Sequence, residues 1–460
     1  MRYSINFCLI LVLLLAFSAC ETLDGLEPQP QQSLSAGEAI RDANGAESAL
    51  TGTYSFLNQD GYFSRMFPVY GSILSGYLGS TTGTTRDITF QSESNSVRPS
   101  DNTLANTWDD IYEVANAASN VIERVGTLSD EDGFTGTRKN EIIAEAKFLR
   151  AMAHFDALRL FGRFWDNSSP LGVPLRLEPG DANNAQLARS TVAEVYASIQ
   201  VDLDGVVADA SGFTVSYFAS QEAGLAMKAR VALYAQEFAL AAQLADQVIQ
   251  SGVFSLEAAY ADVFVNRLNS SEVIFAMFAS QTEGSGHTFF HLTPSSELGA
   301  GRYDYGPTSQ YTDLIAGDPR ESASVGVTPD GPEVRKYPNL TAGDDPTYVL
   351  RLAEMYFIKA EALARSGGDL TEAADALNVV RNRAGLEAVS PSSVEELLAF
   401  LQEERVKELA FEGSHEWFDA IRYGNVSSIK PTVTNENQWA LPIPDIEVDP
   451  NDQLEQNPGY

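Results

Sequence analysis

Two histidines, His287 and His291, have the four-residue spacing with which two imidazoles on one helix face bind zinc. In a metalloprotease helix a glutamate follows the first histidine, but this chain has Thr288 there. The pair also lies in a stretch rich in glycine and serine, where no helix is expected. Incidental loop histidines are therefore the better explanation, and we predict no metal site and no cofactor.

Four glutamates supply the other arrangement that could do chemistry: Glu403, Glu404, Glu408 and Glu412. A glycoside hydrolase needs two carboxyl groups that face each other across a cleft. These four instead lie on one predicted helix, at about residues 394–411, among arginine and lysine side chains. This placement favours an ion-pair network or a solvated helix face. The chain also has neither a Gly-x-Ser-x-Gly elbow nor a phosphate-binding Gly-Lys-Ser/Thr loop. We predict that the protein is not an enzyme, with a surface glycoside hydrolase as an alternative.

Two glycine- and serine-rich stretches, 62–100 and 280–306, contain aromatic residues that could bind a sugar ligand. The apolar faces of sugar rings stack on aromatic side chains, while sugar hydroxyls bond to amides, carboxylates and guanidinium groups. The candidate ligand-binding residues are Tyr62, Phe63, Tyr70, Tyr77, Arg86, Asn95, Phe289, Phe290, Tyr303, Asp304 and Tyr305. Aromatic side chains also anchor loops, so the prediction concerns the group more than any single member.

A helical hairpin at residues 350–384 is the clearest element that could position such loops. Apolar residues recur at three- and four-residue steps in 350–365 and again in 370–384, so each helix has one apolar face. Gly367 and Gly368 supply the reversal between them, and Gly385 follows a basic last turn. This pattern is typical of a tetratricopeptide-like hairpin, and residues 221–252 repeat it.

Further helices are predicted around these hairpins. Their ranges are 39–58, 105–125, 140–162, 191–208 and 394–411, with N-terminal capping residues at Ser190 or Thr191 and at Ser393. Residues 62–100 are expected to be a long irregular insertion, and residues 254–347 a second, loop-rich one with a weak strand pattern at 272–278. The predicted fold is mainly α, with tetratricopeptide-like helix hairpins forming a superhelical scaffold, long irregular loop insertions and little β structure.

The first 19 residues have the features of a signal peptide. Arg2 is followed by a short apolar run, which ends in small residues directly before Cys20. The sequence around Cys20 resembles a bacterial lipobox, in which this cysteine is lipidated and becomes the mature N-terminus. The only other cysteine, Cys8, lies within the segment to be removed, so no intramolecular disulfide is expected. A secreted protein that is cleaved elsewhere is the alternative.

The charge of the chain excludes two classes of partner. Its 63 acidic residues against 30 lysines and arginines give a formal net charge of −33. Such a surface repels nucleic acid and anionic membranes, so we predict neither as a partner. Strong acidity is also typical of proteins from saline habitats, where salt screens the repulsion.

Seven motifs occur in an order that resembles the SusD/RagB family. They are residues 145–151, 351–356, 382–386, 403–405 with 408–413, 417–422, 441–444 and 456–460. The resemblance covers essentially the whole mature chain and implies an α-helical fold with one irregular, ligand-binding side. It implies a non-catalytic lipoprotein on the surface of a Bacteroidota-type outer membrane, which binds oligosaccharides and delivers them to a SusC-like TonB-dependent transporter.

The resemblance also divides the chain into regions. Residues 1–19 are the signal peptide, 20–34 a tether, 35–220 an N-terminal region and 221–460 a C-terminal region, together one compact fold. Some branches of the family capture peptides, so a peptide-binding protein is an alternative function. A helical-repeat scaffold that binds only proteins is a further one.

Overall fold

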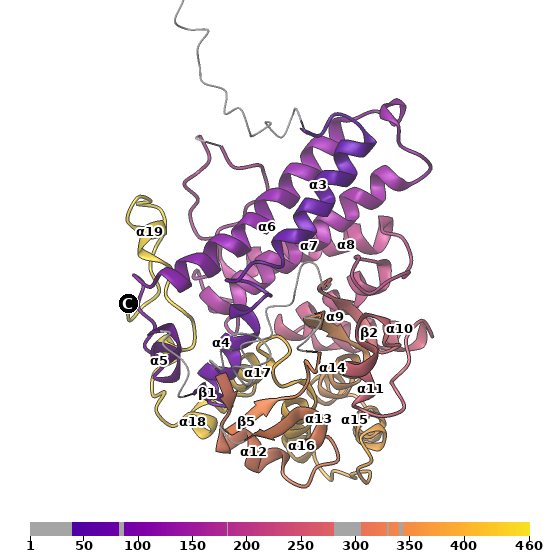
Figure 1. The fold of residues 1–460 in the computed structure, drawn as a ribbon, viewed down its shortest axis with the longest axis vertical. Helices are drawn as coiled ribbons and strands as arrows, with labels where there is room; N and C mark the ends of the chain where they lie inside the picture. Colours follow the sequence, from indigo (N-terminus) through magenta and orange to yellow (C-terminus); the bar gives the residue numbers. More distant parts are fainter. Residues whose placement is uncertain (1–38, 82–86, 182, 280–304, 329–330, 340–343) are drawn as a thin grey trace, which may run out of the picture.

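The computed structural model describes residues 39–81, 87–181, 183–279, 305–328, 331–339 and 344–460 (Figure 1). These residues form a mainly helical fold, as the sequence predicts. The described helices are α3 (Ala43–Phe56), α4 (Met66–Leu74), α5 (Asp87–Glu93), α6 (Asn102–Thr127), α7 (Arg138–Phe161), α8 (Val192–Asp209), α9 (Gln221–Tyr234), α10 (Phe238–Gln250), α11 (Asp262–Asn266), α12 (Ser309–Ile315), α13 (Glu321–Ser324), α14 (Leu352–Ser366), α15 (Leu370–Arg383), α16 (Val394–Leu409), α17 (His415–Tyr423), α18 (Val426–Ile429) and α19 (Asp445–Val448).

The described β structure consists of short antiparallel pairs. The strands are β1 (Leu78–Ser80), β2 (Val273–Ala276), β3 (Tyr305–Pro307), β4 (Val325–Thr328), β5 (Gly331–Val334) and β6 (Tyr348–Arg351), and they pair as β1 with β3, β2 with β6 and β4 with β5. Short 3-10 helices are η2 (Asp130–Asp132), η3 (Arg267–Asn269) and η5 (Glu436–Gln438). The strand expected at 272–278 is confirmed as β2, but all four of its residues are buried instead of alternating.

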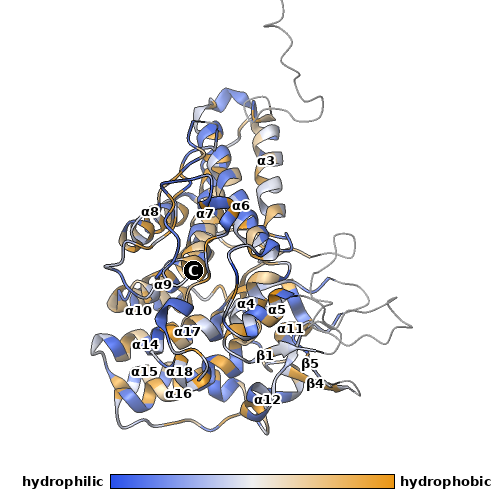
Figure 2. Ribbon diagram, turned by 90° about the vertical axis from the view of Figure 1, so that its left-hand side faces the viewer, coloured by the Kyte–Doolittle hydropathy of each residue, from blue (hydrophilic) through white to orange (hydrophobic). Residues whose placement is uncertain are grey.

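The two predicted hairpins are α9 with α10 and α14 with α15, and α10 packs directly against α14. Figure 2 shows α8, α9, α10, α14 and α15 stacked along one side of the molecule, with α4, α5, β1, β4 and β5 on the other. Gly367 ends α14 in the left-handed conformation with φ 76°, which glycine adopts without a Cβ penalty. The predicted tetratricopeptide-like scaffold with a less regular opposite side is therefore present.

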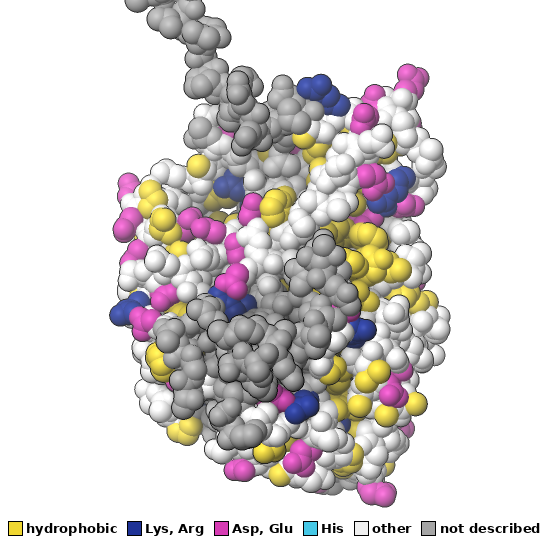
Figure 3. All heavy atoms as spheres, in the orientation of Figure 1, with side chains coloured by type: hydrophobic (Ala, Val, Ile, Leu, Met, Phe, Trp, Pro, Cys, Tyr) yellow, Lys and Arg dark blue, Asp and Glu magenta, His cyan; other side chains and the backbone are white. Residues whose placement is uncertain are grey.

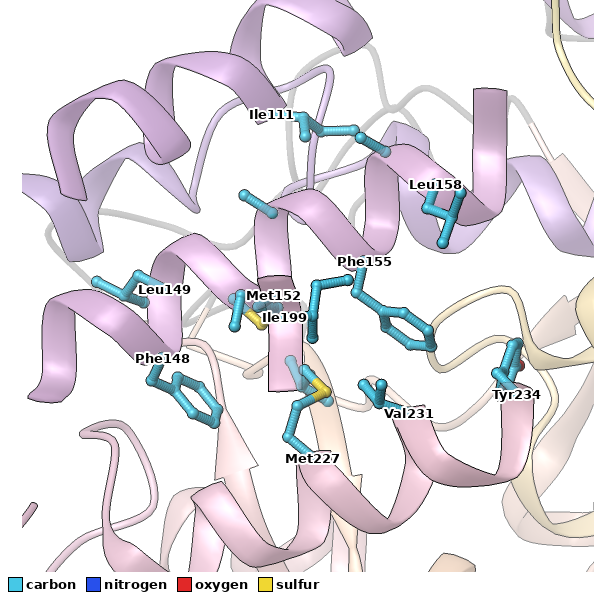
Figure 4. Packing of buried hydrophobic residues seen from close by; sticks show 14 of the residues in the cluster. Ile111, Phe148, Leu149, Met152, Phe155, Leu158, Ile199, Met227, Val231 and Tyr234 are labelled. Carbon is cyan, nitrogen blue, oxygen red and sulfur yellow. The ribbon is translucent and has the colours of Figure 1, made fainter. Parts of the chain in front are cut away.

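Apolar residues at helical spacing build the core between the long helices (Figure 4). Phe148, Met152 and Phe155 of α7 are fully buried, and they point toward Met227 and Val231 of α9. Because α7 is buried on nearly all sides along its second half, it forms the centre around which α6, α8 and α9 pack.

The expectation of a long irregular insertion at 62–100 was wrong for much of that segment. It contains α4, all nine of whose residues are buried, and α5. Helix α4 is apolar on every side, so it shows no one-sided period in the sequence and is stabilised by enclosure in the core. Its Gly71 donates its N–H to Ser414 Oγ at 2.9 Å, which fixes α4 to the segment before α17.

Candidate functional site

The glutamates Glu403, Glu404 and Glu408 lie on α16 and Glu412 follows it. Of the two arrangements that the sequence favours, the buried members form the ion-pair network. Glu408 and Glu412 are buried and bind Arg351, whose Nε donates to Glu412 Oε2 at 2.6 Å and whose Nη1 donates to Glu408 Oε1 at 3.1 Å. Glu404 binds Arg320 at 2.8 Å. Glu403, by contrast, is 53% exposed and pairs with Lys407.

Cationic neighbours set the ionisation of this network. Burial alone raises the pKa of Glu408, but Arg383, Arg351 and Arg320 outweigh it and hold that pKa at about 2. The glutamate is therefore ionised and fully engaged with arginines at neutral pH. Glu408 is 0% exposed, so its carboxylate contacts arginine side chains and not solvent.

Several predicted ligand-binding side chains lie in the protein core. Tyr62, Phe63, Tyr70 and Tyr305 are at most 1% exposed, and Tyr77 is 7% exposed. The Tyr62 hydroxyl donates to Asp156 Oδ2 at 2.7 Å, and its ring centroid lies 4.4 Å from that of Phe63. In this conformation their ring faces are covered by protein, so these rings anchor the segment 62–80 and the strand β3 to the core.

Asn95, a polar residue among the predicted ligand-binding residues, is also buried in the core. It is 4% exposed and has a left-handed backbone with φ 49°, which asparagine tolerates better than most residues. Its Nδ2 donates to the Leu74 carbonyl at 3.3 Å. The other predicted residues, Arg86, Phe289, Phe290, Tyr303 and Asp304, lie outside the described residues, as do His287, His291 and Cys20.

An open cavity of about 550 Å³ brings together aromatic side chains that the sequence did not single out. We call it the aromatic pocket. It lies between the end of α3, the segment before α9 and the end of β2, and its lining residues are Thr51, Tyr54, Ser55, Leu57, Asn58, Tyr217, Phe218, Phe275, Ala276, Met277 and Phe278. Figure 3 shows hydrophobic side chains gathered on this face of the molecule, between α8 and β2 of Figure 1.

The rings of the aromatic pocket form a connected series. Tyr217 lies 4.9 Å from Phe218 and 5.0 Å from Phe278, and Phe218 lies 5.3 Å from Tyr54, all between ring centroids. The planes of neighbouring rings differ by 57° to 71°. Phe218 and Phe278 are each 42% exposed, and Tyr217 and Tyr54 are half-buried. The series therefore presents apolar ring surface to solvent at several angles.

Hydrogen bonds fix the walls of the aromatic pocket. The Tyr54 hydroxyl donates to Glu145 Oε2 and accepts from the Ala219 N–H, both at 2.8 Å. Burial of this hydroxyl and the charge of Glu145 raise the pKa of Tyr54 well above its usual value, so the phenol stays neutral. Across the pocket, the Ala276 N–H donates to the Ser216 carbonyl at 2.8 Å. The segment 216–219 is thus held at both ends, which places Tyr217 and Phe218.

The chemistry of this lining suits an uncharged amphipathic ligand. Thr51, Ser55 and Asn58 supply hydroxyl and amide groups beside the rings. In the part of the chain that the structure describes, its lining includes no lysine, arginine, aspartate or glutamate. Within the described ranges, no group of three or more histidine, cysteine, aspartate or glutamate residues is arranged to hold a metal ion. The lining side chains can bind a ligand by stacking and hydrogen bonding.

A second cavity, of about 530 Å³ beside α19, has a different character. Its lining includes Asp109, Glu113, Asp181 and Glu447, while the ring of Trp108 is only 3% exposed. Burial and neighbouring acids raise the pKa of Asp109 and of Glu447. Tyr112 also lines this cavity, and its ring is half-buried. No ring in its described lining is as exposed as those of Phe218 and Phe278, so the aromatic pocket is the better candidate for ligand binding.

Sequence reasoning missed Tyr54, Tyr217, Phe218 and Phe278. One signal was present: adjacent Tyr217 and Phe218 lie in a short connection between two helices, where little core is available to bury both. Nothing in the sequence indicated that this pair meets the end of β2, because the contact joins distant segments.

Comparisons with known proteins agree with this description. Two family models match, one described as "SusD family" over residues 309–429 and one as "Starch-binding associating with outer membrane" over residues 69–233. "SusD-like protein P38" of Formosa agariphila is 26% identical, and the alignment covers 99% of both chains. A solved structure titled as a putative sugar binding protein from Bacteroides vulgatus is 26% identical, with a TM-score of 0.78 over 92% of this chain and 99% of that one. A structure titled "Laminarin binding SusD-like protein" is 22% identical, with a TM-score of 0.76 over 91% of this chain and 100% of that one.

The fold and the pocket together define a helical-repeat protein with an open, aromatic cavity. The matching models cover residues 69–233 and 309–429, and the Formosa relative aligns over 99% of the chain. The chain belongs to the SusD/RagB family, as its motifs predicted.

Proposed function

We propose that this protein is a non-catalytic, cell-surface lipoprotein that binds oligosaccharides and delivers them to a SusC-like TonB-dependent transporter of the outer membrane. The observation that carries the binding function is the aromatic pocket, in which half-open rings stand beside hydroxyl and amide groups. Pyranose rings have apolar C–H faces and polar edges, and this lining matches both.

The relatives support a saccharide as the ligand. The printed names of the similar proteins include a laminarin-binding protein and a putative sugar-binding protein, and one matching family model is described as starch-binding. That description also names association with the outer membrane, which accords with lipid attachment at Cys20 after removal of residues 1–19. The region 20–34 would then connect the lipid to the fold, which comprises the regions 35–220 and 221–460.

Calorimetric titration of the chain that begins after Cys20 tests the binding function. We expect binding of one or more oligosaccharides from a panel of glucans, mannans, xylans and galactans, with no hydrolysis products in the mixture. Tyr217→Ala should weaken this binding, whereas Phe90→Ala, which removes a ring that is 48% exposed on α5, should not. Binding of peptides instead of saccharides would establish the peptide-capturing alternative, and glycan cleavage would establish a hydrolase.

The residues predicted at Arg86, Phe289, Phe290, Tyr303 and Asp304 remain part of the proposed ligand-binding surface. Residues 280–304 follow directly after Phe278 and Ala279, so this segment is joined to the aromatic pocket in the sequence. A Tyr303→Ala variant that loses affinity in the same titration would include it in the site. Unchanged affinity would limit the site to the aromatic pocket.

Lipid attachment is tested separately from binding. The full-length protein should incorporate a labelled fatty acid and fractionate with the outer membrane, and Cys20→Ser should do neither. A protease added to intact cells should degrade the wild-type protein if it faces outward. Co-purification with a TonB-dependent transporter from the same membranes would support the proposed partner, and its absence after mild solubilisation would argue against it.

A further inference from the structure

The described lining of the aromatic pocket is uncharged, in a protein that carries a large negative charge. Its lining residues are apolar, aromatic, hydroxyl or amide side chains, whereas the whole chain has a formal net charge of −33. Sites that take acidic ligands place arginine or lysine where the anion sits. Among the residues that the structure describes, this lining places neither there.

A basic side chain in the cavity that adjoins the pocket is already paired with carboxylates. A smaller cavity shares Thr51, Tyr54 and Phe218 with the aromatic pocket, and its lining adds Arg138. Arg138 donates through Nε and Nη2 to Glu47 at 2.6 and 2.8 Å and through Nη1 to Glu145 at 2.6 Å. One guanidinium is thus paired with two carboxylates. This cluster of Glu47, Arg138 and Glu145 behind Tyr54 therefore has a net negative charge.

The hydroxyl group of Tyr54, whose ring lines the pocket, is also bound to a carboxylate. Tyr54 donates its hydroxyl to Glu145, so this hydroxyl has no hydrogen left to donate to a ligand. An acidic sugar at the rings would lose part of its hydration without gaining a cationic partner from the described lining, and loss of hydration by an unpaired charge is costly. It would also be repelled by the net charge of −33 that the whole chain carries.

We propose that the aromatic pocket selects uncharged oligosaccharides and rejects those that carry carboxylate or sulfate groups. This inference rests on the proposed function, because it names the class of saccharide that the same site takes. A neutral sugar has no charged group whose hydration is lost on binding. Stacking on the rings and hydrogen bonds to its hydroxyl groups therefore suffice for binding.

A matched pair of ligands tests this selectivity. Laminari-oligosaccharides, which are neutral glucans, are compared with the same oligosaccharides after oxidation of their C6 hydroxymethyl groups to carboxylates, by calorimetry at low and at high salt. We expect the oxidised form to bind at least about ten-fold more weakly at low salt, with a smaller difference at high salt because salt screens the repulsion. The same comparison is made with any other neutral oligosaccharide that binds in the panel and its oxidised form.

A charge variant in the pocket locates the effect. Asn58→Lys places a cation in the lining and should recover part of the binding of the oxidised ligand. Ile446→Lys adds the same charge at a residue that is 65% exposed on α19, outside that lining, and should not. Equal recovery by both variants would assign the discrimination to the overall charge and overturn selection by the pocket.

The outcomes also separate this inference from the proposed function. Equal or tighter binding of the oxidised form by the wild-type protein overturns the selectivity and leaves oligosaccharide binding intact. If none of the neutral or acidic saccharides binds, the proposed function fails, and the inference that rests on it fails as well.

Discussion

The ring of Tyr217 lies 5.0 Å from the ring of Phe278, with the two ring planes 62° apart. This contact joins the connection between α8 and α9 to the residues that follow β2. Edge-to-face packing leaves part of each ring free, and Phe278 remains 42% exposed. Two segments that are distant in the sequence therefore meet at a surface that can stack on a ligand.

Removing the exposed ring of this pair should weaken saccharide binding. We expect Phe278→Ala to lower the affinity by about 5- to 30-fold, which corresponds to roughly 1–2 kcal/mol for an aromatic contact at the centre of a binding site. Calorimetric titration with the best oligosaccharide of the panel measures the change. Phe278→Tyr, which keeps a ring, should retain most of the affinity, and an equal loss in both variants would contradict a stacking role.

The buried ion network predicts a large loss of stability when one partner is removed. Arg351 is 1% exposed at its side chain and contacts Glu272, Glu408 and Glu412. Arg351→Met leaves these buried carboxylates without their shared cation, so the free energy of unfolding should fall by about 3–5 kcal/mol. Denaturant unfolding followed by circular dichroism measures it.

A surface pair provides the control for this prediction. Arg98 and Asp87 form an ion pair in which the two side chains are 60% and 66% exposed. Arg98→Met should change the free energy of unfolding by less than about 1 kcal/mol, because solvent screens exposed pairs. Similar losses in the two variants would mean that burial does not determine the contribution of these ion pairs.

The lowered pKa of Glu361 predicts how the stability of the protein depends on pH. Burial raises its pKa, but Arg422 outweighs burial, with help from Arg365 and Arg405, and holds the pKa at about 2. Because the folded-state pKa lies below the unfolded value near 4.5, the stabilisation by this carboxylate is complete above pH 4.5 and is lost as the pH falls toward 2. The Tyr423 hydroxyl also donates to Glu361, at 2.9 Å.

The measurement is a comparison of Glu361→Gln with the wild-type protein between pH 7 and pH 2. The variant should be less stable by about 3 kcal/mol at pH 7, and the difference should shrink below pH 4.5. Glu403→Gln, at a side chain that is 53% exposed, should give a profile close to the wild type. A difference between Glu361→Gln and wild type that stays constant with pH would rule out the ionised carboxylate as the source of the stabilisation.

The close approach of α4 to the segment before α17 predicts an effect of a single methyl group. A Cβ atom at Gly71 would lie 2.3 Å from Ser414 Cβ, so Gly71→Ala forces the two segments apart. We expect a loss of about 1–3 kcal/mol in the free energy of unfolding. Gly52→Ala is the matched change in α3, where a Cβ meets no atom within 4 Å, and it should raise stability by up to about 1 kcal/mol. A destabilised Gly52→Ala or an unaffected Gly71→Ala would contradict this packing.

The sequence by itself determined the helices of the scaffold and the family. Apolar periods, glycines after helix ends and capping residues act within a few positions of each other, so hairpins such as α14 with α15 were predicted closely. Thr191 and Glu194 form the complete capping box that opens α8. For Glu408 and Glu412 the sequence left an ion-pair network or a solvated helix face open, because basic residues accompany them, and the structure shows the network.

Only the tertiary structure decided which aromatic rings face solvent. Tyr62 and Tyr70 were placed in a binding surface because their segment is rich in small and polar residues, yet α4 and its neighbours enclose them in the core. Tyr217 and Phe278 remain half-open because three segments distant in the chain meet without filling the space between them. Burial depends on these long-range contacts, whereas a local pattern records only the neighbours of a residue in the sequence.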